Sequence, residues 1–298
     1  DVGKCTYTHM LNSDGGIEAD LTVVSVDENH FRIISSAATR ERDKHHIKKH
    51  LNKDIELEDV TDDYCVFGLF GPKSRDLMNS LSNNNFSNEN FRFSTAKFIS
   101  IEDTKIWTQR LSYVGELGYE LYVEVKDAKK IYELIVNKGK DFNLSNCGMH
   151  AMDIMRMESG FLHWGHDISP EENQYQAGLS FTISNKKNVD FIGKRALEKI
   201  DKKKIKTRFA MFTLKDSKPG EPLLLHDEPI YLKDQIIGKS TSGNYSFNFK
   251  KNLTFGYISN DFSNEQLKNS ELFIEVEKKK YEIEIINEPL KQTNFKSN

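Results

Sequence analysis

The order of the expected secondary structure changes near residue 200, and this change limits the possible folds more than any single motif does. Before it, some segments have apolar residues at helical spacing and others at strand spacing, so helices and strands are mixed. After it come only short extended segments separated by turns, which is typical of a small barrel. We therefore predict an α+β domain over residues 1–200 and a C-terminal β-barrel domain over residues 201–298.

The bounds of the expected segments follow from the same patterns. In the first domain we expect strands at 6–11, 20–26, 30–35, 96–101 and 105–112, a buried strand at 65–71, a strand pair around Gly115–Gly118 and an extended stretch at 55–60. Helices are expected at 38–51, 74–81, 127–138 and 147–160. After a basic linker at 201–206, the barrel strands are expected at 209–214, 228–232, 236–240, 253–258, 272–276 and 281–286.

A tight hairpin is expected at the turn Asn12-Ser-Asp-Gly15-Gly16, because Asp-Gly-Gly is a strong hairpin signal. Asp20 follows on a strand otherwise composed of Leu and Val. A carboxylate in such a strand lowers stability if it is buried without a partner. Asp20 is therefore a candidate catalytic residue that accepts a proton from an amine or stabilises a developing cation. The alternative is an edge-strand acid in water.

A second candidate lies in the run from Arg110 to Val123, where Gly115 and Gly118 interrupt an aromatic strand pattern. This run places Glu120 among tyrosines, where an ordinary strand would carry packing residues. Two carboxylate oxygens match paired N–H donors, and aromatic faces stack on a flat ring. Glu120 is therefore a candidate ligand-binding residue, and a solvated Glu on a strand-turn-strand is the alternative.

Composition excludes several classes of function. The net charge is -3, from 42 basic and 45 acidic residues, so no overall field indicates nucleic acid or an anionic membrane as a partner. The three cysteines lie far apart without CxxC spacing, which argues against disulfides and structural zinc and favours a reducing compartment. No apolar run approaches the roughly 20 residues that span a bilayer. No GxGxxG or GxxxxGK[ST] motif occurs, so we expect no nucleotide phosphate cradle.

Metal-binding residue types occur at His163 and His166, with His150 upstream. Trp164 and Gly165 interrupt the pair, and no other ligand pair lies nearby in the sequence. We therefore expect no metal, and we interpret the histidines as part of a pocket wall or as hydrogen-bonded structural residues.

Methionines recur at Met152, Met155 and Met157 on an expected helix that also carries Arg156 and Glu158. Core packing is the expected role of the methionines, and an adaptable pocket wall is the alternative. Arg156 and Glu158 are expected to make structural polar links.

Four motifs, taken in order, resemble the aminomethyltransferase (glycine cleavage T-protein) superfamily, and the match runs nearly end to end. They are Tyr7…Gly15-Gly16-Ile-Glu-Ala-Asp20, Tyr113-Val-Gly-Glu-Leu-Gly-Tyr-Glu120, Gly148-Met-His-Ala-Met-Asp-Ile-Met-Arg156-Met-Glu158-Ser-Gly160 and Phe191-Ile-Gly193-Lys-Arg-Ala-Leu197. Details such as His163-Trp164-Gly165 and Thr241-Ser-Gly-Asn-Tyr-Ser look closest to the folate-binding C-terminal half of dimethylglycine and sarcosine dehydrogenases.

The resemblance implies a tetrahydrofolate site in a central cavity of the first domain. Asp20 would be the catalytic carboxylate at the reactive N5/N10 edge, and Glu120 would bind the amino-pyrimidine edge of the pterin. Tyr7 and Tyr113 match aromatic pocket positions, and Trp164 stands where T-proteins usually carry Tyr. The family's helix motif normally has a folate-contacting Arg where this chain has Met152, a change that points away from a true T-protein.

The implied reaction forms 5,10-methylene-tetrahydrofolate from an oxidised N-methyl amine of the dimethylglycine or sarcosine type. FAD is expected only from a separate or upstream flavoprotein domain or subunit, with folate and a small methylated amine as the other partners. The compartment would be the cytoplasm, or the mitochondrial matrix in a eukaryote. The chain does not begin with Met, and roughly the first fifty residues of the family domain lack a counterpart, so we expect an N-terminally truncated folate domain.

Two other functions fit the resemblance. One is a glycine cleavage T-protein or folate-dependent demethylase. The other is a non-catalytic folate-binding or sensing module. Asp20 argues against the non-catalytic module, because binding alone does not need an acid at the reactive edge of the ligand.

Overall fold

The computed structural model describes residues 1–184, 189–292 and 296. By its internal contacts the chain forms two compact units. Unit 1 consists mainly of Asp1–Thr8 and Leu21–Gly148, and unit 2 of His9–Asp20 and Met149–Gln292. This division joins the first hairpin turn to the C-terminal half of the chain. The expected domain boundary near residue 200 stays a prediction.

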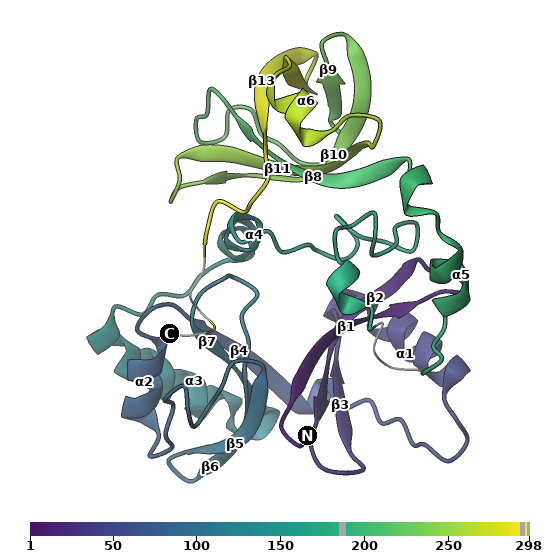
Figure 1. The fold of residues 1–298 in the computed structure, drawn as a ribbon. Helices are drawn as coiled ribbons and strands as arrows, with labels where there is room; N and C mark the ends of the chain where they lie inside the picture. Colours follow the sequence, from purple (N-terminus) through teal and green to yellow (C-terminus); the bar gives the residue numbers. More distant parts are fainter. Residues whose placement is uncertain (185–188, 293–295, 297–298) are drawn as a thin grey trace. The chain divides into compact units, whose positions relative to one another are not determined.

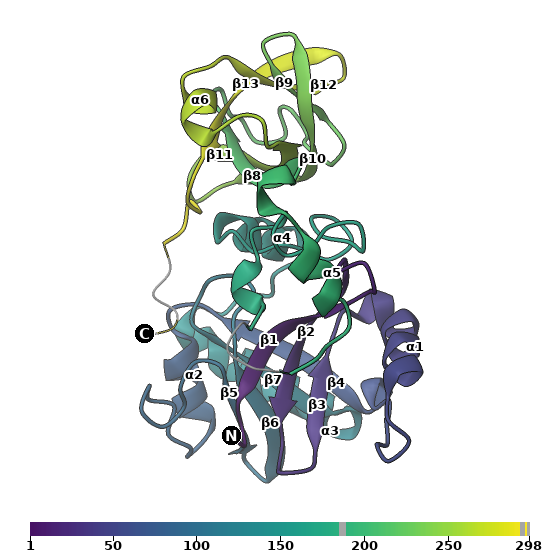
Figure 2. The same ribbon diagram turned by 45° about the vertical axis from the view of Figure 1, so that its right-hand side comes forward.

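The chain opens with a three-stranded sheet in the order β1-β2-β3, which Figure 2 shows in purple. Its strands are β1 (Cys5–Leu11), β2 (Ile17–Ser25) and β3 (Phe31–Ile34), and helix α1 (Arg40–His50) follows. All four elements confirm the sequence predictions. Residues 55–60 were expected to be extended, and they form no sheet strand.

Unit 1 is built around a four-stranded antiparallel sheet in the order β4-β7-β6-β5. Its strands are β4 (Tyr64–Phe70), β5 (Thr95–Ile101), β6 (Thr104–Arg110) and β7 (Gly118–Glu124). Helices α2 (Ser74–Leu81) and α3 (Val125–Gly139) lie against β4 and β7 (Figure 1). The prediction that β4 is buried is wrong for most of its length, because β4 is an edge strand and only Leu69 is fully enclosed.

The two faces of this sheet have different roles. Side chains of β7 alternate, so Tyr119, Leu121 and Val123 point toward α2 and α3 and join the larger apolar core. Tyr122 points to the other face, where it packs with Trp107, Cys5 and Val24. Glu120 lies on this second face, by the same alternation.

Unit 2 contains α4 (Met149–Glu158), α5 (Lys194–Lys199), α6 (Asn264–Lys268) and the barrel. The barrel, drawn in green to yellow in Figure 1, closes in the order β10-β11-β8-β13-β12-β9. Its strands are β8 (Thr207–Leu214), β9 (Pro229–Leu232), β10 (Gln235–Ser246), β11 (Lys251–Ser259), β12 (Leu272–Val276) and β13 (Lys279–Ile286). The six expected strands are thus confirmed, and β10 extends beyond its expected end. Among the described residues, no helix is both long and apolar enough to cross a bilayer.

Candidate functional site

The hairpin that carries Asp20 is fixed by its turn. The Asn12 side-chain oxygen accepts hydrogen bonds from the backbone N–H groups of Asp14 and Gly16, at 3.0 and 2.8 Å. Gly15 has φ +84°, a backbone conformation that favours glycine. A Cβ added at Gly16 would lie 1.8 Å from the Pro170 carbonyl oxygen. The Gly15-Gly16 pair is therefore required by the geometry of the turn.

Two other motifs of the sequence hold this hairpin within unit 2. The Trp164 indole N–H donates to the carbonyl of Ile17 at 2.9 Å. Gly193 packs against Asn12, where an added Cβ would lie 2.7 Å from the Asn12 carbonyl oxygen. The structure thus joins the motifs of Trp164 and Gly193 to the turn preceding Asp20. Since its N–H is engaged by the backbone, Trp164 can offer a ligand only its ring.

Asp20 is half-buried on β2. Alternation places it on the same side of the strand as Thr22 and Val24. Val24 is fully buried in the cluster that contains Trp107 and Tyr122. Asp20 belongs to unit 2 and Glu120 to unit 1, so the predicted convergence of the two carboxylates on one ligand stays a prediction.

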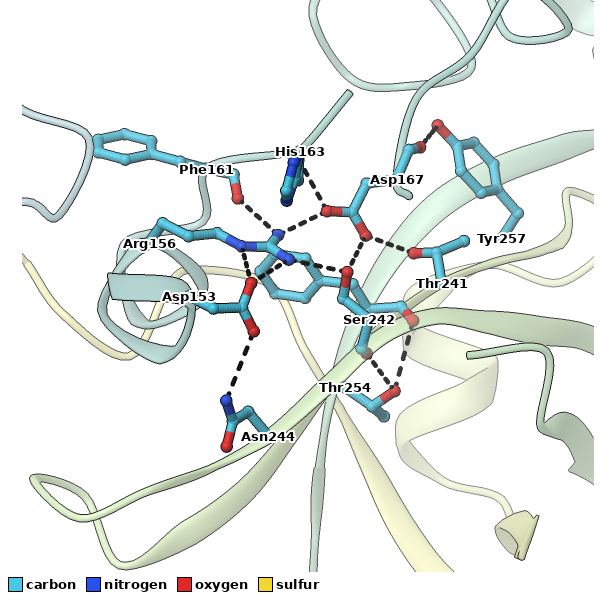
Figure 3. Close-up of polar contacts among 11 residues, drawn as sticks. Asp153, Arg156, Phe161, His163, Asp167, Thr241, Ser242, Asn244, Thr254 and Tyr257 are labelled. Carbon is cyan, nitrogen blue, oxygen red and sulfur yellow. Dashed lines mark hydrogen bonds and ion pairs between the residues drawn. The ribbon is translucent and has the colours of Figure 1, made fainter. Parts of the chain in front are cut away.

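Helix α4 carries Met152 and a buried ion pair. Arg156 is 1% exposed, and its Nη1 lies 2.5 Å from Oδ2 of Asp167, whose side chain is fully buried. Arg156 also donates to Asp153, to the Phe161 carbonyl and to the Ser242 hydroxyl (Figure 3). The pair therefore links α4 to the following loop and to barrel strand β10.

Asp167 is the centre of this network (Figure 3). Its carboxylate also accepts the Thr241 hydroxyl at 2.5 Å, the Ser242 hydroxyl at 2.8 Å and the His163 backbone N–H at 3.0 Å. The Thr241-Ser motif of the sequence is thus a set of donors to a buried carboxylate. Nothing in this network requires a ligand.

Glu158, at the end of α4, makes a second link to the barrel. Its carboxylate accepts the Ser246 hydroxyl at 2.6 Å and the Asn248 side-chain amide at 3.0 Å. Arg156 and Glu158 thus make the structural polar links expected from the sequence. Met152 is partly buried on the same helix, and its predicted contact with a ligand stays a prediction.

Glu120 stands at the centre of the candidate site in unit 1. Strand pairing places it between Gly68 of β4 and Gln109 of β6. Gly68 offers no side chain, and Phe70 packs over the backbone there: an added Cβ would lie 2.5 Å from the Phe70 ring at Gly68 and 2.1 Å at Gly118. The two glycines thus leave room for the Phe70 ring on the face that carries Glu120.

The electrostatics of Glu120 are those of a carboxylate removed from water. Burial raises the pKa of its carboxyl, and the hydrogen bond from the Tyr122 hydroxyl to Oε2, at 3.0 Å, acts in the opposite direction. Burial, followed by the nearby Glu120 charge, raises the pKa of the Cys5 thiol to about 12. Arg32 lies over the Tyr122 ring, with its guanidinium carbon 5.8 Å from the ring centroid. Glu120 is thus poised to gain from charge-assisted hydrogen bonds.

Gln109 was missed by the sequence analysis. Its side chain is fully buried, and neither amide atom has a hydrogen-bond partner among the described residues. It is the in-register neighbour of Glu120. A signal was present, because Gln109 is a polar residue two positions after Trp107 on the same strand face, immediately before the Glu120 motif.

The two predicted aromatic residues have different surroundings. Tyr113 is partly buried in the turn between β6 and β7, which the Ser112 hydroxyl fixes by accepting the Glu116 N–H at 3.0 Å. Tyr7 lies on β1 and is 41% exposed. Their roles as pocket residues stay predictions.

The histidine pair is a local contact. The ring centroids of His163 and His166 lie 4.7 Å apart. Burial lowers the pKa of His163, and the nearby positive charges of His166 and Arg156 lower it further. The charge of Asp167 acts in the opposite direction. Across the described residues, no group of three or more His, Cys, Asp or Glu side chains is arranged to hold a metal ion.

Comparison with protein families gives matches over most of the chain. The profile of the GCVT N-terminal domain matches residues 1–187, and that of the glycine cleavage T-protein C-terminal barrel domain matches residues 208–291. The mitochondrial dimethylglycine dehydrogenase of Rattus norvegicus is 33% identical over 293 residues, which cover 97% of this chain and 33% of that protein. This chain therefore spans about a third of the length of that relative.

Shorter relatives match over a larger share of their length. The aminomethyltransferase of Halothermothrix orenii is 30% identical over 260 residues, which cover 87% of this chain and 71% of the enzyme. Among solved structures, the glycine cleavage system aminomethyltransferase T from Bartonella henselae has a TM-score of 0.83 at 20% identity, covering 97% of this chain and 76% of the other. At that identity the likeness establishes a common fold.

Proposed function

The chain belongs to the glycine cleavage T-protein family, and from this premise we propose that it transfers a one-carbon unit to tetrahydrofolate. The family and the fold class expected from the sequence motifs are confirmed. The proposed carbon source is an oxidised N-methyl amine of the dimethylglycine or sarcosine type. The similarity to dimethylglycine dehydrogenase supports this choice.

The proposed reaction balances as follows. A flavoprotein takes two electrons and a proton from the N-methyl group, and the amine becomes an iminium ion. Tetrahydrofolate supplies two nucleophilic N–H groups, and the products are 5,10-methylene-tetrahydrofolate, the demethylated amine and one proton. Asp20 would accept a proton and stabilise the cationic amine through its negative charge. The flavin, as FAD, would be supplied by a separate or upstream domain or subunit.

The observation that carries the proposal is the setting of Glu120. A carboxylate whose pKa is raised by burial lies beside a fully buried amide, Gln109, that has no partner among the described residues. Gly68 and Gly118 leave room for the Phe70 ring, which adds an aromatic surface to the same face. These features fit a flat ligand with paired N–H donors, such as the amino-pyrimidine edge of a pterin.

The remaining assignments belong to the proposal as well. Tyr7, Tyr113 and Trp164 would supply aromatic walls, and Met152 an apolar contact. The cytoplasm, or the mitochondrial matrix in a eukaryote, is the proposed compartment. Folate, a small methylated amine and a flavoprotein are the proposed partners, without nucleic acid or membrane.

The test separates binding from transfer. Tetrahydrofolate binding is measured by calorimetry, and methylene-tetrahydrofolate is quantified with dimethylglycine and an added flavoprotein dehydrogenase. Asp20→Asn should retain binding and lose transfer by about 10²–10⁴-fold. Glu120→Ala should weaken binding about 10- to 150-fold, as expected for losing a charge-assisted hydrogen bond. If both variants bind and turn over like the wild type, the site assignment is wrong.

A second candidate is aminomethyl transfer from a lipoyl carrier. The coverage of 71% of the Halothermothrix orenii aminomethyltransferase favours it. Met152, at the position where T-proteins usually carry Arg, argues against it. Turnover with an aminomethyl-lipoyl carrier protein, and none with the oxidised amine, would select this candidate. Folate binding without either turnover would select the non-catalytic module.

A further inference from the structure

We propose that Gln109 binds the ligand beside Glu120 and selects the reduced form of the pterin. The inference rests on the proposed function and extends it to a residue outside the family motifs quoted above. The side-chain amide of Gln109 is buried without hydrogen-bond partners among the described residues. A buried donor or acceptor without a partner lowers the stability of the folded protein, because it has lost its hydrogen bonds to water. Gln109 is 0% exposed, and both its Nε2 and its Oε1 lack a partner among the described residues.

The strand register decides where this amide points. Gln109 pairs with Glu120, and Trp107 pairs with Tyr122, so these four side chains share the sheet face opposite α2 and α3. Directly opposed residues have Cβ atoms about 4.5–5.5 Å apart. The Glu120 carboxylate accepts the Tyr122 hydroxyl at 3.0 Å, and the amide of Gln109 is left for another partner.

The neighbouring polar groups close one end of this face. The guanidinium carbon of Arg32 lies 4.9 Å from the Tyr64 ring centroid and 5.6 Å from that of Trp107. Arg32 thus fills the space beside Trp107 and Tyr122. Glu120 and Gln109 lie one step further along the strands, toward Gly118, where Gly68 and Gly118 carry no side chain and the Phe70 ring packs over them.

The chemistry of an amide differs from that of a carboxylate. A carboxylate accepts two N–H groups, whereas an amide presents one donor beside one acceptor. In tetrahydrofolate, ring N1 lies beside N8–H, and the O4 carbonyl lies beside N5–H. Both edges match an amide. In fully oxidised folic acid neither N5 nor N8 carries hydrogen, so both edges present acceptors only. Gln109 therefore favours the reduced pterin.

The experiment measures affinity by calorimetry for tetrahydrofolate, 7,8-dihydrofolate and folic acid. Gln109→Met keeps the length of the side chain and removes the amide. It should weaken tetrahydrofolate about tenfold or more and change folic acid little, so that the ratio of the two affinities falls. Because 7,8-dihydrofolate keeps N8–H and lacks N5–H, its response identifies which edge is bound.

Thr108→Val is the matched control. Thr108 precedes Gln109 and is equally buried, and its Oγ1 has no hydrogen-bond partner among the described residues. Its neighbour on strand β7 is Leu121, which lies in the core under the helices, so Thr108 points to the helix-facing side of the sheet. Its variant should leave all three affinities unchanged. If Gln109→Met does not fold, wild type is measured with 5-deaza- and 8-deaza-tetrahydrofolate, one of which should bind at least tenfold more weakly.

The outcomes separate the two proposals. An unchanged affinity ratio in folded Gln109→Met, or equal wild-type binding of tetrahydrofolate and both deaza analogues, overturns the role of Gln109 and leaves folate binding standing. Wild type that binds no tetrahydrofolate overturns the proposed function and this inference together.

Discussion

Removing the charge of Asp167 should destabilise unit 2 far more than an ordinary surface substitution. Asp167→Asn keeps the shape of the side chain but leaves the Arg156 guanidinium, 1% exposed, without its fully buried counter-ion. Asp153 remains beside Arg156, but its side chain is 32% exposed and its charge is partly screened. Breaking a buried ion pair from one side typically costs about 3–5 kcal/mol. We expect Asp167→Asn to lose that much.

The double variant Arg156→Gln/Asp167→Asn should be more stable than Asp167→Asn alone, because it leaves no buried charge unpaired. A suitable control is Asp227→Asn, since Asp227 pairs with Lys239 at 2.6 Å with side chains 58% and 65% exposed. The control should change stability by less than about 1 kcal/mol.

The assay uses the two tryptophans of the chain, Trp107 and Trp164. Trp107 lies in unit 1 and Trp164 in unit 2, so Trp107→Phe leaves fluorescence that reports unit 2. Urea unfolding in that background gives the free energy for each variant. A loss below about 1 kcal/mol for Asp167→Asn would refute the reasoning. The same holds if the losses of the single variants Arg156→Gln and Asp167→Asn simply add in the double variant.

Three further predictions concern Gly118, His9 and Glu120. Gly118→Ala puts a Cβ 2.1 Å from the Phe70 ring, so the free energy of unfolding of unit 1, measured with urea, should fall by about 1–3 kcal/mol. A Cβ at Gly148 meets nothing within 4 Å, so Gly148→Ala should leave that free energy unchanged. Equal stability of the two variants would contradict this prediction. Burial lowers the pKa of His9 from 6.5 to about 4. Between these two pH values the unfolded state binds more protons than the folded state, so the free energy of unfolding should rise with pH. In His9→Gln this rise in the free energy of unfolding should be absent. Burial raises the pKa of Glu120, so tetrahydrofolate affinity, measured by calorimetry, should increase with pH in the mildly acidic range, and Glu120→Gln should show no such increase.

The sequence by itself determined the local elements. The Asp-Gly-Gly turn, the apolar alternation of the barrel segments and the helical spacing of α2, α3 and α4 are fixed by residues close in the chain, so these elements were predicted. The position of Glu120 on a strand face was predicted for the same reason, from Gly118 and its neighbours.

Only the tertiary structure decided which distant residues meet. Strand register placed Gln109 beside Glu120, and neither residue type nor local spacing specifies a partner strand. The exposure of β4 followed from its position at the edge of its sheet. Similarly, Asp167 contacts Thr241 and Ser242 more than 70 residues away, because burial of its charge requires donors that only the folded barrel can supply.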